Sequence, residues 1–319
     1  MIDVAIVSYG SADDLADCVS SLLRQETKIN SIRICENAGR NEFLRTVSVV
    51  ETCLDGKNIS VGAEFSGRTL SGAEIIVYDA GENLGYAGGI NHCLERMSSD
   101  WSHLWIVNPD AVPEGDALSA LLDRQKAADA DIVGGVLVFS GTEKIQSCGG
   151  YWRPWIARGL NLGMGKALSD KPDPDVVAQS MNYVSGACML VTRSYVETVG
   201  PMRDDYFLYC EEVDWCLRRG NHRLAFAPDA IIYHKHGTTI GSHRDRKRRS
   251  RLSVYLDERN KIILTRRIYP LRLPIVACAT LLLLMQYLVD GAFANFGHGV
   301  AGWWAGVRGQ TGRPPWMKA

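Results

Sequence analysis

The sequence has no marked excess of charge of either sign. Its 319 residues include 35 Lys and Arg against 36 Asp and Glu, for a formal net charge of -1. A general nucleic-acid binder needs a basic surface that neutralises phosphates, so this balance argues against that class. Apolar residues make up 46% of the chain, which allows a large buried core in one large domain or two ordinary ones.

The nine cysteines include no CxxC pair, their number is odd and their spacing is irregular. Several of them stand inside apolar runs, which is typical of reduced, buried thiols rather than of a disulfide framework. The first apolar run, at residues 4–9, has no basic segment before it, so we expect no secretory signal. Together these absences predict a cytoplasmic protein.

Apolar, strand-like runs alternate with amphipathic segments through the N-terminal part of the chain. The runs at 3–9, 31–37, 74–80, 103–111 and 131–139 predict strands, and helical periodicity marks 11–25, 87–97 and 114–128. This alternation predicts an α/β sheet with parallel strands. The polar, glycine-dotted stretch at 38–72 predicts a loop or an insertion. Farther on, 182–200 predicts a strand and a helix, 206–220 an acidic helix start, and 224–237 a strand pair or one bent strand.

In parallel sheets, ligands bind beyond the carboxyl ends of the strands. Polar residues stand at these predicted ends: Ser8, Tyr9, Glu36, Asn37, Asp79, Asn108 and Asp110. We therefore expect a binding site where these residues gather.

The segment NLGYAGGINHCL, residues 83–94, has three glycines in five positions. Such a stretch suits a loop around a phosphate, but glycine-rich turns are also common. A dinucleotide-dependent oxidoreductase is one class that uses such a loop. The glycines here follow the third predicted strand rather than the first, and their spacing is not GxGxxG, which weakens that alternative.

Two short motifs carry possible metal ligands. Asn108-Pro109-Asp110 follows a buried strand, and a hard divalent cation shares carboxylate oxygens with phosphates; the same tripeptide is also a good turn. His234 and His236 stand two residues apart on a predicted strand and so point the same way. One of them suits a metal ligand, and a surface histidine pair is the alternative.

The segment YCEEVDWCLR brings Glu211, Glu212 and Asp214 within four residues, among aromatic side chains. Clustered acids raise one another's pKa, which suits a general base. The alternative is a helix N-terminus, where acids complement the helix dipole.

The order of these motifs is more specific than any one of them. From residue 3 to 268 the chain resembles the inverting glycosyltransferases of family 2, and within them the rhamnosyltransferase-like branch. The resemblance implies a GT-A fold with a nucleotide-binding half at 1–111 and an acceptor-binding half at 112–268. It implies a nucleotide-sugar donor, a Mg²⁺ or Mn²⁺ cofactor and a saccharide acceptor.

The resemblance also implies roles for single residues. The family's DNASxD segment reads ENAGR here, so that Glu36 takes the place of the acid that contacts the donor, together with Ser8 and Tyr9. The implied donor loop comprises Asn83, Gly85, Gly88, Gly89 and Asn91, and Asn108, in place of the first acid of the family's DxD motif, is also implied to bind the donor. Asp110 and His234, with His236 as the fallback, are the implied metal ligands.

The second acid of the family's acidic pair is its catalytic base, and Glu212 stands at that position. It would take the proton of the acceptor hydroxyl while that oxygen displaces the diphosphate and inverts the sugar. The implied acceptor site comprises Gly186, Ala187, Glu211 and Asp214. A catalytically inactive nucleotide-sugar-binding protein is the alternative of another class, and the presence of Asp110, Glu212 and His234 together argues against it.

The rhamnosyltransferase-like branch implies dTDP-L-rhamnose as the donor and a lipid-linked saccharide as the acceptor, in cell-surface polysaccharide synthesis. A UDP-hexose is the alternative donor. A 6-deoxy sugar calls for an apolar subsite, for which Trp152, Trp155 and Tyr183 are candidates by residue type.

The C-terminal part is basic and then apolar. The run at 243–251 has six Lys or Arg and is interpreted as a solvated loop, a lid over the diphosphate or a lipid contact. The run at 273–293 is apolar nearly throughout, with arginines before it and tryptophans beyond it. We expect residues 269–319 to form a tail at the cytoplasmic membrane surface. A buried helix or a contact in a homo-oligomer is the alternative.

Overall fold

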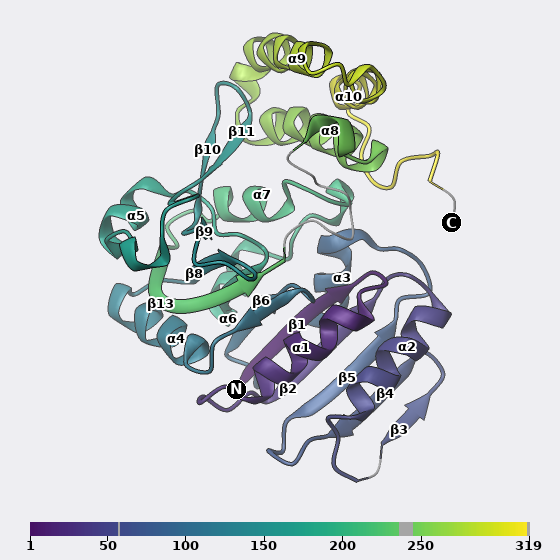
Figure 1. Ribbon diagram of the computed structural model, residues 1–319, viewed down its shortest axis with the longest axis vertical. Coiled ribbons are helices and arrows are strands. Elements are labelled where there is room, and N and C mark those ends of the chain that lie inside the picture. The colour runs from purple at the N-terminus through teal and green to yellow at the C-terminus, as the bar shows by residue number, and fades with distance from the viewer. Residues whose placement is uncertain (57, 236–244, 318–319) are drawn as a thin grey trace.

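A mixed sheet with a mostly parallel N-terminal part forms the centre of the protein. The computed structural model describes residues 1–56, 58–235 and 245–317 (Figure 1). The strands lie in the order β3-β4-β5-β2-β1-β6-β12-β8-β13-β7, with β9 beside β8 and a separate β10–β11 hairpin. Strands β5, β2, β1 and β6 are parallel neighbours, whereas β12 is antiparallel to β6 and β8. The bounds are β1 Ile2–Ser8, β2 Ser31–Glu36, β3 Ile59–Val61, β4 Glu64–Arg68, β5 Glu74–Asp79, β6 His103–Val107, β7 Ala111–Pro113, β8 Ile132–Phe139, β9 Ile145–Ser147, β10 Gly150–Arg153, β11 Arg158–Asn161, β12 Cys188–Thr192 and β13 Leu224–His234.

Helices cover both faces of this sheet. The bounds are α1 Ala12–Leu23, α2 Arg40–Glu51, α3 Gly85–Leu94, α4 Ala117–Ala128, α5 Pro174–Ser180, α6 Arg193–Val199, α7 Glu211–Leu217, α8 Arg251–Ile268, α9 Leu273–Val289 and α10 Phe293–Val307. Side chains alternate along β1, so that Val4 and Ile6 join the core under α1, α2 and α4, while Ala5 and Val7 join the core under α3. Burial on both faces explains why the strand reads as one continuous apolar run.

Two details differ from the sequence-based prediction. The stretch at 38–72 was expected to be a loop or an insertion, but it forms α2 and the antiparallel pair β3–β4. Only Phe43, Thr46 and Val50 of α2 are buried. The buried face of this helix is narrow, so the apolar periodicity of the sequence was too weak to predict a helix. The helix expected at 87–97 begins two residues earlier, at Gly85, and so contains all three glycines. The segment at 224–237 contains one bent strand rather than a pair, with a register shift between Phe226 and Ile231.

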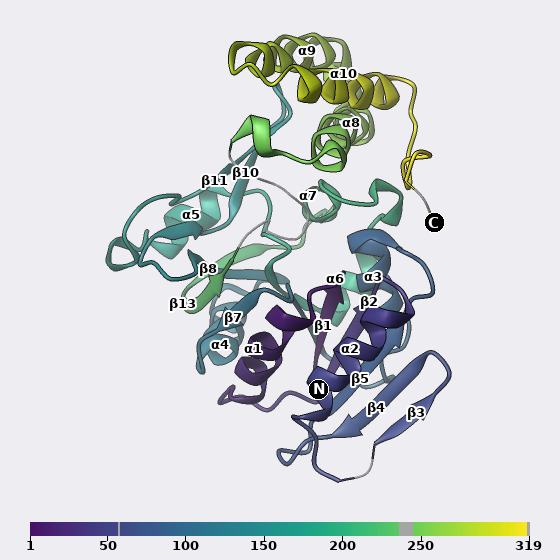
Figure 2. The same ribbon diagram turned by 45° about the vertical axis from the view of Figure 1, so that its right-hand side comes forward.

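The three C-terminal helices α8, α9 and α10 form a layer beyond α7, away from the main sheet (Figures 1 and 2). Helix α10 lies so close to α8 that a Cβ on Gly302 would come within 2.2 Å of the Tyr255 carbonyl oxygen. Gly306 similarly faces the Arg259 carbonyl oxygen, and a Cβ on Gly306 would lie 2.6 Å from that oxygen. Helix α10 is therefore packed onto α8 through small side chains.

Candidate active site

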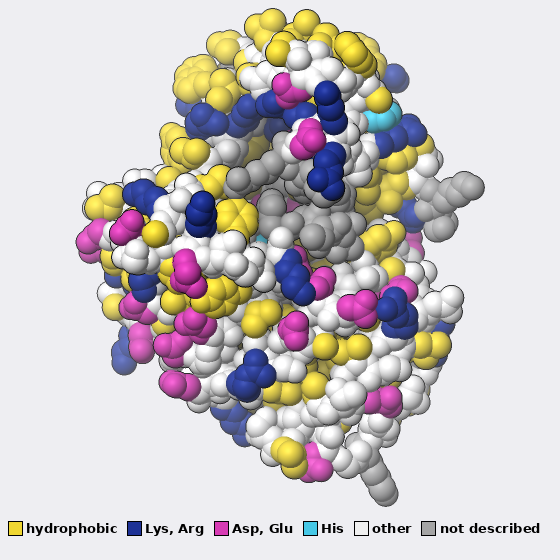
Figure 3. Space-filling view, in the orientation of Figure 1, with side chains coloured by type: hydrophobic (Ala, Val, Ile, Leu, Met, Phe, Trp, Pro, Cys, Tyr) yellow, Lys and Arg dark blue, Asp and Glu magenta, His cyan; other side chains and the backbone are white. Residues whose placement is uncertain are grey.

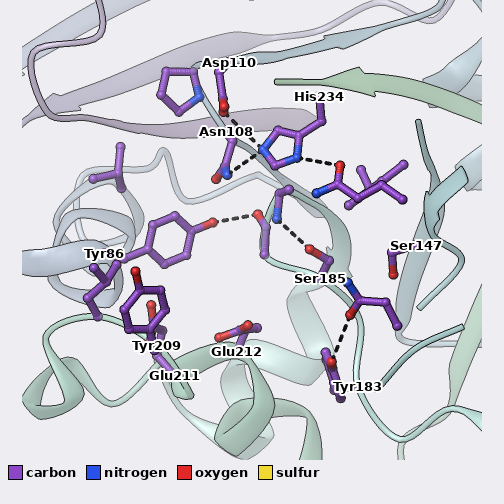
Figure 4. Close-up of a pocket in the computed structure, with 18 of the residues that line it drawn as sticks. Tyr86, Asn108, Asp110, Ser147, Tyr183, Ser185, Tyr209, Glu211, Glu212 and His234 are labelled. Atoms are coloured by element: carbon purple, nitrogen blue, oxygen red, sulfur yellow. Dashed lines mark hydrogen bonds and ion pairs between the residues drawn. The ribbon is translucent and has the colours of Figure 1, made fainter. Parts of the chain in front are cut away.

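A cavity of about 320 Å³ opens at the carboxyl end of β1 and beside the turn after β6 (Figure 4). Its walls come from segments far apart in the sequence, as is typical of ligand sites in α/β sheets. The predicted site residues that line it are Tyr9, Asn108, Asp110, Gly186, Ala187, Glu211, Glu212 and His234. The turn after β6 supplies Asn108 and Asp110, the end of β13 supplies His234, and the start of α7 supplies the two glutamates.

Asp110 and His234 face each other across the turn and the strand end. The Asp110 Oδ1 and His234 Nε2 atoms lie 3.2 Å apart, and Asn108 Nδ2 is 3.3 Å from the same nitrogen. On its other side, His234 Nδ1 lies 3.0 Å from Gln146 Oε1. An amide oxygen can only accept, so Nδ1 donates to Gln146, and this bond turns Nε2 toward Asp110 and Asn108.

This donor set fits a divalent cation that shares its coordination with a phosphate ligand. A carboxylate oxygen and an imidazole nitrogen come together, and the histidine is oriented by a second hydrogen bond, as metal-binding histidines usually are. Within residues 1–56, 58–235 and 245–317 no group of three His, Cys, Asp or Glu is placed to hold a metal. The remaining ligands would therefore have to come from a substrate or water, as for Mg²⁺ at phosphate sites. The fallback ligand, His236, lies outside the described residues.

Glu211 and Glu212 lie across the cavity from this pair, on the first turn of α7 (Figure 4). Burial and the neighbouring Glu212 raise the pKa of Glu211 to about 8, against lowering by the backbone N–H groups of Glu211 and Tyr209. Burial also raises the pKa of Glu212, against lowering by the backbone N–H groups of Glu212 and Val213. Two adjacent carboxyls with raised pKa values can hold and exchange a proton near neutral pH.

The loop that leads into these acids has an unusual backbone. Phe207, Tyr209 and Cys210 have φ angles of 67°, 72° and 74°, where residues with a Cβ are rarely found. Each such angle costs on the order of 1 kcal/mol or more, so surrounding contacts must hold it. One contact is from the Tyr86 N–H, which donates to the Phe207 carbonyl oxygen at 2.9 Å.

The glycines and asparagines of the predicted glycine loop pack against neighbouring segments and do not line the cavity. Gly85 has a φ of +74°, and a Cβ there would be 2.1 Å from the Phe207 carbonyl oxygen. Gly89 faces Val7 of β1, and Gly88 faces Leu84 and Asp204. The two asparagines make internal hydrogen bonds, from the Gly85 N–H to Asn83 Oδ1 and from Asn91 Nδ2 to the Met202 carbonyl.

Ser8, Glu36 and Asp214 are fully buried outside the cavity lining. The Glu36 carboxylate accepts from the Gly10 and Ala38 N–H groups and from the Thr46 hydroxyl. The Asp214 carboxylate accepts from Arg203, Arg218 and Tyr206 and so ties α7 to its surroundings. These contacts pair both buried carboxylates with donors inside the protein.

Of the three candidates for an apolar sugar wall, Tyr183 lines the cavity. Trp152 is buried in the core, and Trp155 is exposed on the β10–β11 connection, with the Arg272 guanidinium 4.4 Å from its ring centroid. The described part of the basic run, 245–251, is bound to the C-terminal helices: Arg246 pairs with Asp290, and Arg249 pairs with Asp257. No residue of 245–251 lines the cavity.

Several lining residues were missed by sequence reasoning. Tyr86 belongs to the glycine segment, and its hydroxyl donates to the Gly186 carbonyl oxygen at 2.6 Å. Burial raises its pKa, so the phenol stays neutral and keeps this bond. Tyr209 is the first residue of the acidic segment YCEEVDWCLR, for whose aromatic side chains the sequence predicted no role in a site. The others have no local signal because distant segments bring them in: Ser11, Gln146, Ser147, Asn161 and Ser185.

Comparison with known proteins gives one family. The model of the family described as "Glycosyltransferase like family 2" matches residues 2–252. The low-salt glycan biosynthesis hexosyltransferase Agl10 of Haloferax volcanii is 22% identical over 255 residues, which are 76% of this chain and 79% of that protein. An N-acetylglucosaminyl-diphospho-decaprenol L-rhamnosyltransferase of Mycobacterium tuberculosis is 26% identical over 179 residues, half of this chain and 58% of that protein.

Solved structures support the fold. A mannosyltransferase from Pyrobaculum calidifontis, in complex with GDP-Man and Mn²⁺, matches with a TM-score of 0.53 at 15% identity, over 96% of this chain and 86% of that one. Residues 1–349 of TarS from S. aureus match with a TM-score of 0.52 at 9% identity, over 96% and 80% of the two chains. The GT-A fold predicted from the sequence is confirmed.

Proposed function

The chain belongs to glycosyltransferase family 2, and on that premise we propose that it is a metal-dependent, inverting enzyme that transfers a sugar from a nucleotide sugar to a saccharide acceptor. One observation carries the proposal. Asp110 and His234, which suit a metal ion, and Glu211 and Glu212, which suit a general base, face one cavity from opposite sides. Transfer needs these two functions close together, one for the leaving diphosphate and one for the attacking hydroxyl.

Asp110 and His234 would hold the cation against the donor diphosphate. A bound Mg²⁺ or Mn²⁺ supplies positive charge where negative charge develops on the leaving group. The contact with Gln146 fixes the orientation of the histidine ring, so that Nε2 faces Asp110. The mannosyltransferase of Pyrobaculum calidifontis was solved with Mn²⁺ beside GDP-Man, which is consistent with a metal in this fold.

Glu212 is the proposed catalytic base. It lies in the cavity and has a raised pKa, which makes its carboxylate a better proton acceptor than an ordinary glutamate. Glu211 is more deeply buried beside it, and burial together with the charge of Glu212 raises the pKa of Glu211, which favours its protonated form. A neutral Glu211 leaves Glu212 as the single negative charge of the pair, ready to take the proton of an acceptor hydroxyl.

The proposed donor is dTDP-L-rhamnose, with a UDP-hexose as the second candidate. The relative from Mycobacterium tuberculosis is a rhamnosyltransferase that acts on a diphospho-decaprenol acceptor, whereas the relative from Haloferax volcanii is a hexosyltransferase. The Tyr183 ring in the cavity wall suits the methyl group of a 6-deoxy sugar. A pocket for a methyl group rejects a hydroxymethyl only weakly, on the order of 10²-fold, so that kinetics must decide between them.

The test is a panel of nucleotide sugars with a saccharide acceptor, in which released nucleoside diphosphate is measured with Mn²⁺ and after chelation. We expect metal-dependent release and the highest kcat/KM with dTDP-L-rhamnose. A clear preference for a UDP-hexose would overturn the donor and leave the transferase. Donor binding without release from any donor would instead favour the inactive sugar-binding protein.

We also propose that α9 and α10 rest on an anionic membrane surface, where a lipid-linked acceptor would reach the site from the cytoplasmic side. Residues 270–289 form a helix long and apolar enough to span a membrane, and only 22% of its apolar window is buried. Figure 3 shows an apolar cap over these helices with a band of Lys and Arg below it. Exposed basic residues of this region are Lys247, Arg248, Arg251, Arg266 and Arg308. An apolar face bordered by cations fits the interface of a bilayer with anionic headgroups.

Removing residues 270–319 would be a poor test of the membrane contact, because α10 covers the backbone of α8. A single charge on the exposed face is better. Leu282→Asp should weaken sedimentation with anionic liposomes, since Leu282 is 72% exposed on α9. The matched control is Leu70→Asp, at a residue 87% exposed in the N-terminal half. Equal loss in both variants, or no loss in Leu282→Asp, would contradict the proposal.

A further inference from the structure

One side chain of α8, Asn260, contacts three carbonyl oxygens of the strained loop before the acid pair. Asn260 is fully buried. Its Nδ2 atom lies within hydrogen-bond distance of three carbonyl oxygens of the loop, those of Tyr206, Leu208 and Tyr209, at 2.9, 2.7 and 3.0 Å. The loop has turned its backbone so that these oxygens face α8. The N–H group of Tyr209 faces the other way, toward the Glu211 carboxylate.

Arg259 fixes the orientation of the Asn260 amide. Its Nε donates to Asn260 Oδ1 at 2.9 Å, so the amide nitrogen must point at the loop. The Arg259 Nη2 atom adds a second donor to the Tyr206 carbonyl oxygen at 2.8 Å. Both side chains are buried, and the arginine is anchored further by the Gly312 carbonyl oxygen.

The loop is the direct connection to the acids. Cys210 has a φ of 74° and is followed at once by Glu211 and Glu212, which begin α7. Asp214 N–H donates to the Cys210 carbonyl oxygen, so the first turn of the helix starts from this residue. A change in the loop backbone therefore moves the acid pair relative to Asp110 and His234, which lie on the sheet.

We propose that Asn260 is a positioning residue for catalysis: by gathering the carbonyl oxygens of Tyr206, Leu208 and Tyr209, it holds the loop in the one conformation that aims Glu212 into the cavity. Arg259 orients it. Asn260 itself lines no part of the cavity and so acts only through the loop. This inference rests on the proposed function, because it takes Glu212 as the base.

The test compares Asn260→Ala and Asn260→Asp with the wild type. We expect kcat to fall about 100-fold or more, since a misplacement of about 1 Å can have that effect, while the KM for the donor stays nearly unchanged. Asp has the volume of Asn but cannot donate when ionised, so we expect Asn260→Asp to be at least as impaired as Asn260→Ala. A residue that only filled space would show the reverse order, with the aspartate variant the milder one.

The chain offers a matched control in Asn295 of α10. This asparagine is also buried, and its Nδ2 donates to the carbonyl oxygens of Arg246 and Arg249 and to none of the carbonyl oxygens of the acid loop. Asn295→Ala should lower the thermal stability but keep the wild-type kcat in the folded protein. If Asn295→Ala and Asn260→Ala lose kcat equally, or if Asn260→Ala keeps it, the proposal is overturned.

A second measurement does not need the transferase reaction. Amide hydrogen exchange of peptides covering 204–214 should accelerate in Asn260→Ala and stay at the wild-type rate in Asn295→Ala. Unchanged exchange in Asn260→Ala would refute the positioning role by itself. Absence of transfer from every nucleotide sugar would refute the proposed function, and the exchange result would still decide whether Asn260 holds the loop.

Discussion

Replacing Glu212 by Gln tests the chemistry at the centre of the proposed mechanism. Gln has the length and shape of Glu, and its amide oxygen can still accept from the backbone N–H groups of Glu212 and Val213 that the carboxylate now faces. The substitution therefore removes the proton acceptor and leaves the helix start in place.

A positioned base contributes typically 10²–10⁴-fold to a rate, which corresponds to about 3–5 kcal/mol of activation free energy. We expect Glu212→Gln to lose kcat by a factor in that range. Donor affinity should change little, because the donor's diphosphate is proposed to bind at Asp110 and His234, on the other side of the cavity. The residual rate reflects substrate positioning and the metal.

The assay is steady-state release of nucleoside diphosphate from pH 5 to 9, with donor affinity measured separately. The base must be ionised, so the wild-type rate should fall as the pH drops through the apparent pKa of the coupled pair. Because burial raises the pKa values of both glutamates, this fall should occur above the ordinary glutamate value of 4.5. The fall should disappear in Glu212→Gln. A larger kcat loss in Glu211→Gln than in Glu212→Gln would refute the assignment of the base.

Three further predictions concern the metal, the acid pair and the packing of the loop. Asp110→Asn should lose most of the Mn²⁺ stimulation of turnover while the melting temperature stays near that of the wild type; an unchanged metal titration would remove Asp110 from the site. The folded-state pKa of Glu211 is raised from 4.5 to about 8, so its contribution to stability is full below pH 4.5 and is lost as the pH rises toward 8. Melting temperatures across that range should therefore fall more steeply in the wild type than in Glu211→Gln, and parallel curves would contradict the shift. Gly85→Ala should lose more stability and kcat than Gly141→Ala, because both glycines have similar positive φ angles but only at Gly85 does a Cβ meet the Phe207 carbonyl.

Much of the fold follows from local patterns. Continuous apolar runs such as VAIVS predict strands that are buried on both faces, and β1 is such a strand. The positions after these strands are polar because the sheet opens there, which is why Asn108 and Asp110 could be placed in a site before any contact was known. The acidic start of α7 could also be predicted, because a cluster of acidic residues is typical of a helix N-terminus.

Roles that depend on close packing could not be predicted locally. The glycines at 85 and 89 match a phosphate-loop pattern, yet in the structure their missing side chains admit Phe207 and Val7. A sequence records that a side chain is absent but not which neighbour fills the space. Glu36 and Asp214 show the same limit for charge, since the sequence does not record that internal donors surround both carboxylates.

The sequence by itself determined the alternation of the main strands and helices outside residues 38–72, the polar strand ends and the acidic helix start, because these depend on periodicity and on neighbours within a few residues. Only the tertiary structure decided that His234 meets Asp110, 124 positions earlier in the chain, and that Asn260 meets the loop at 206–209. Such contacts depend on how whole elements pack, and packing is set by the shapes of many side chains together. The tertiary structure likewise placed α10 against α8, which made the expected tail a part of the folded protein.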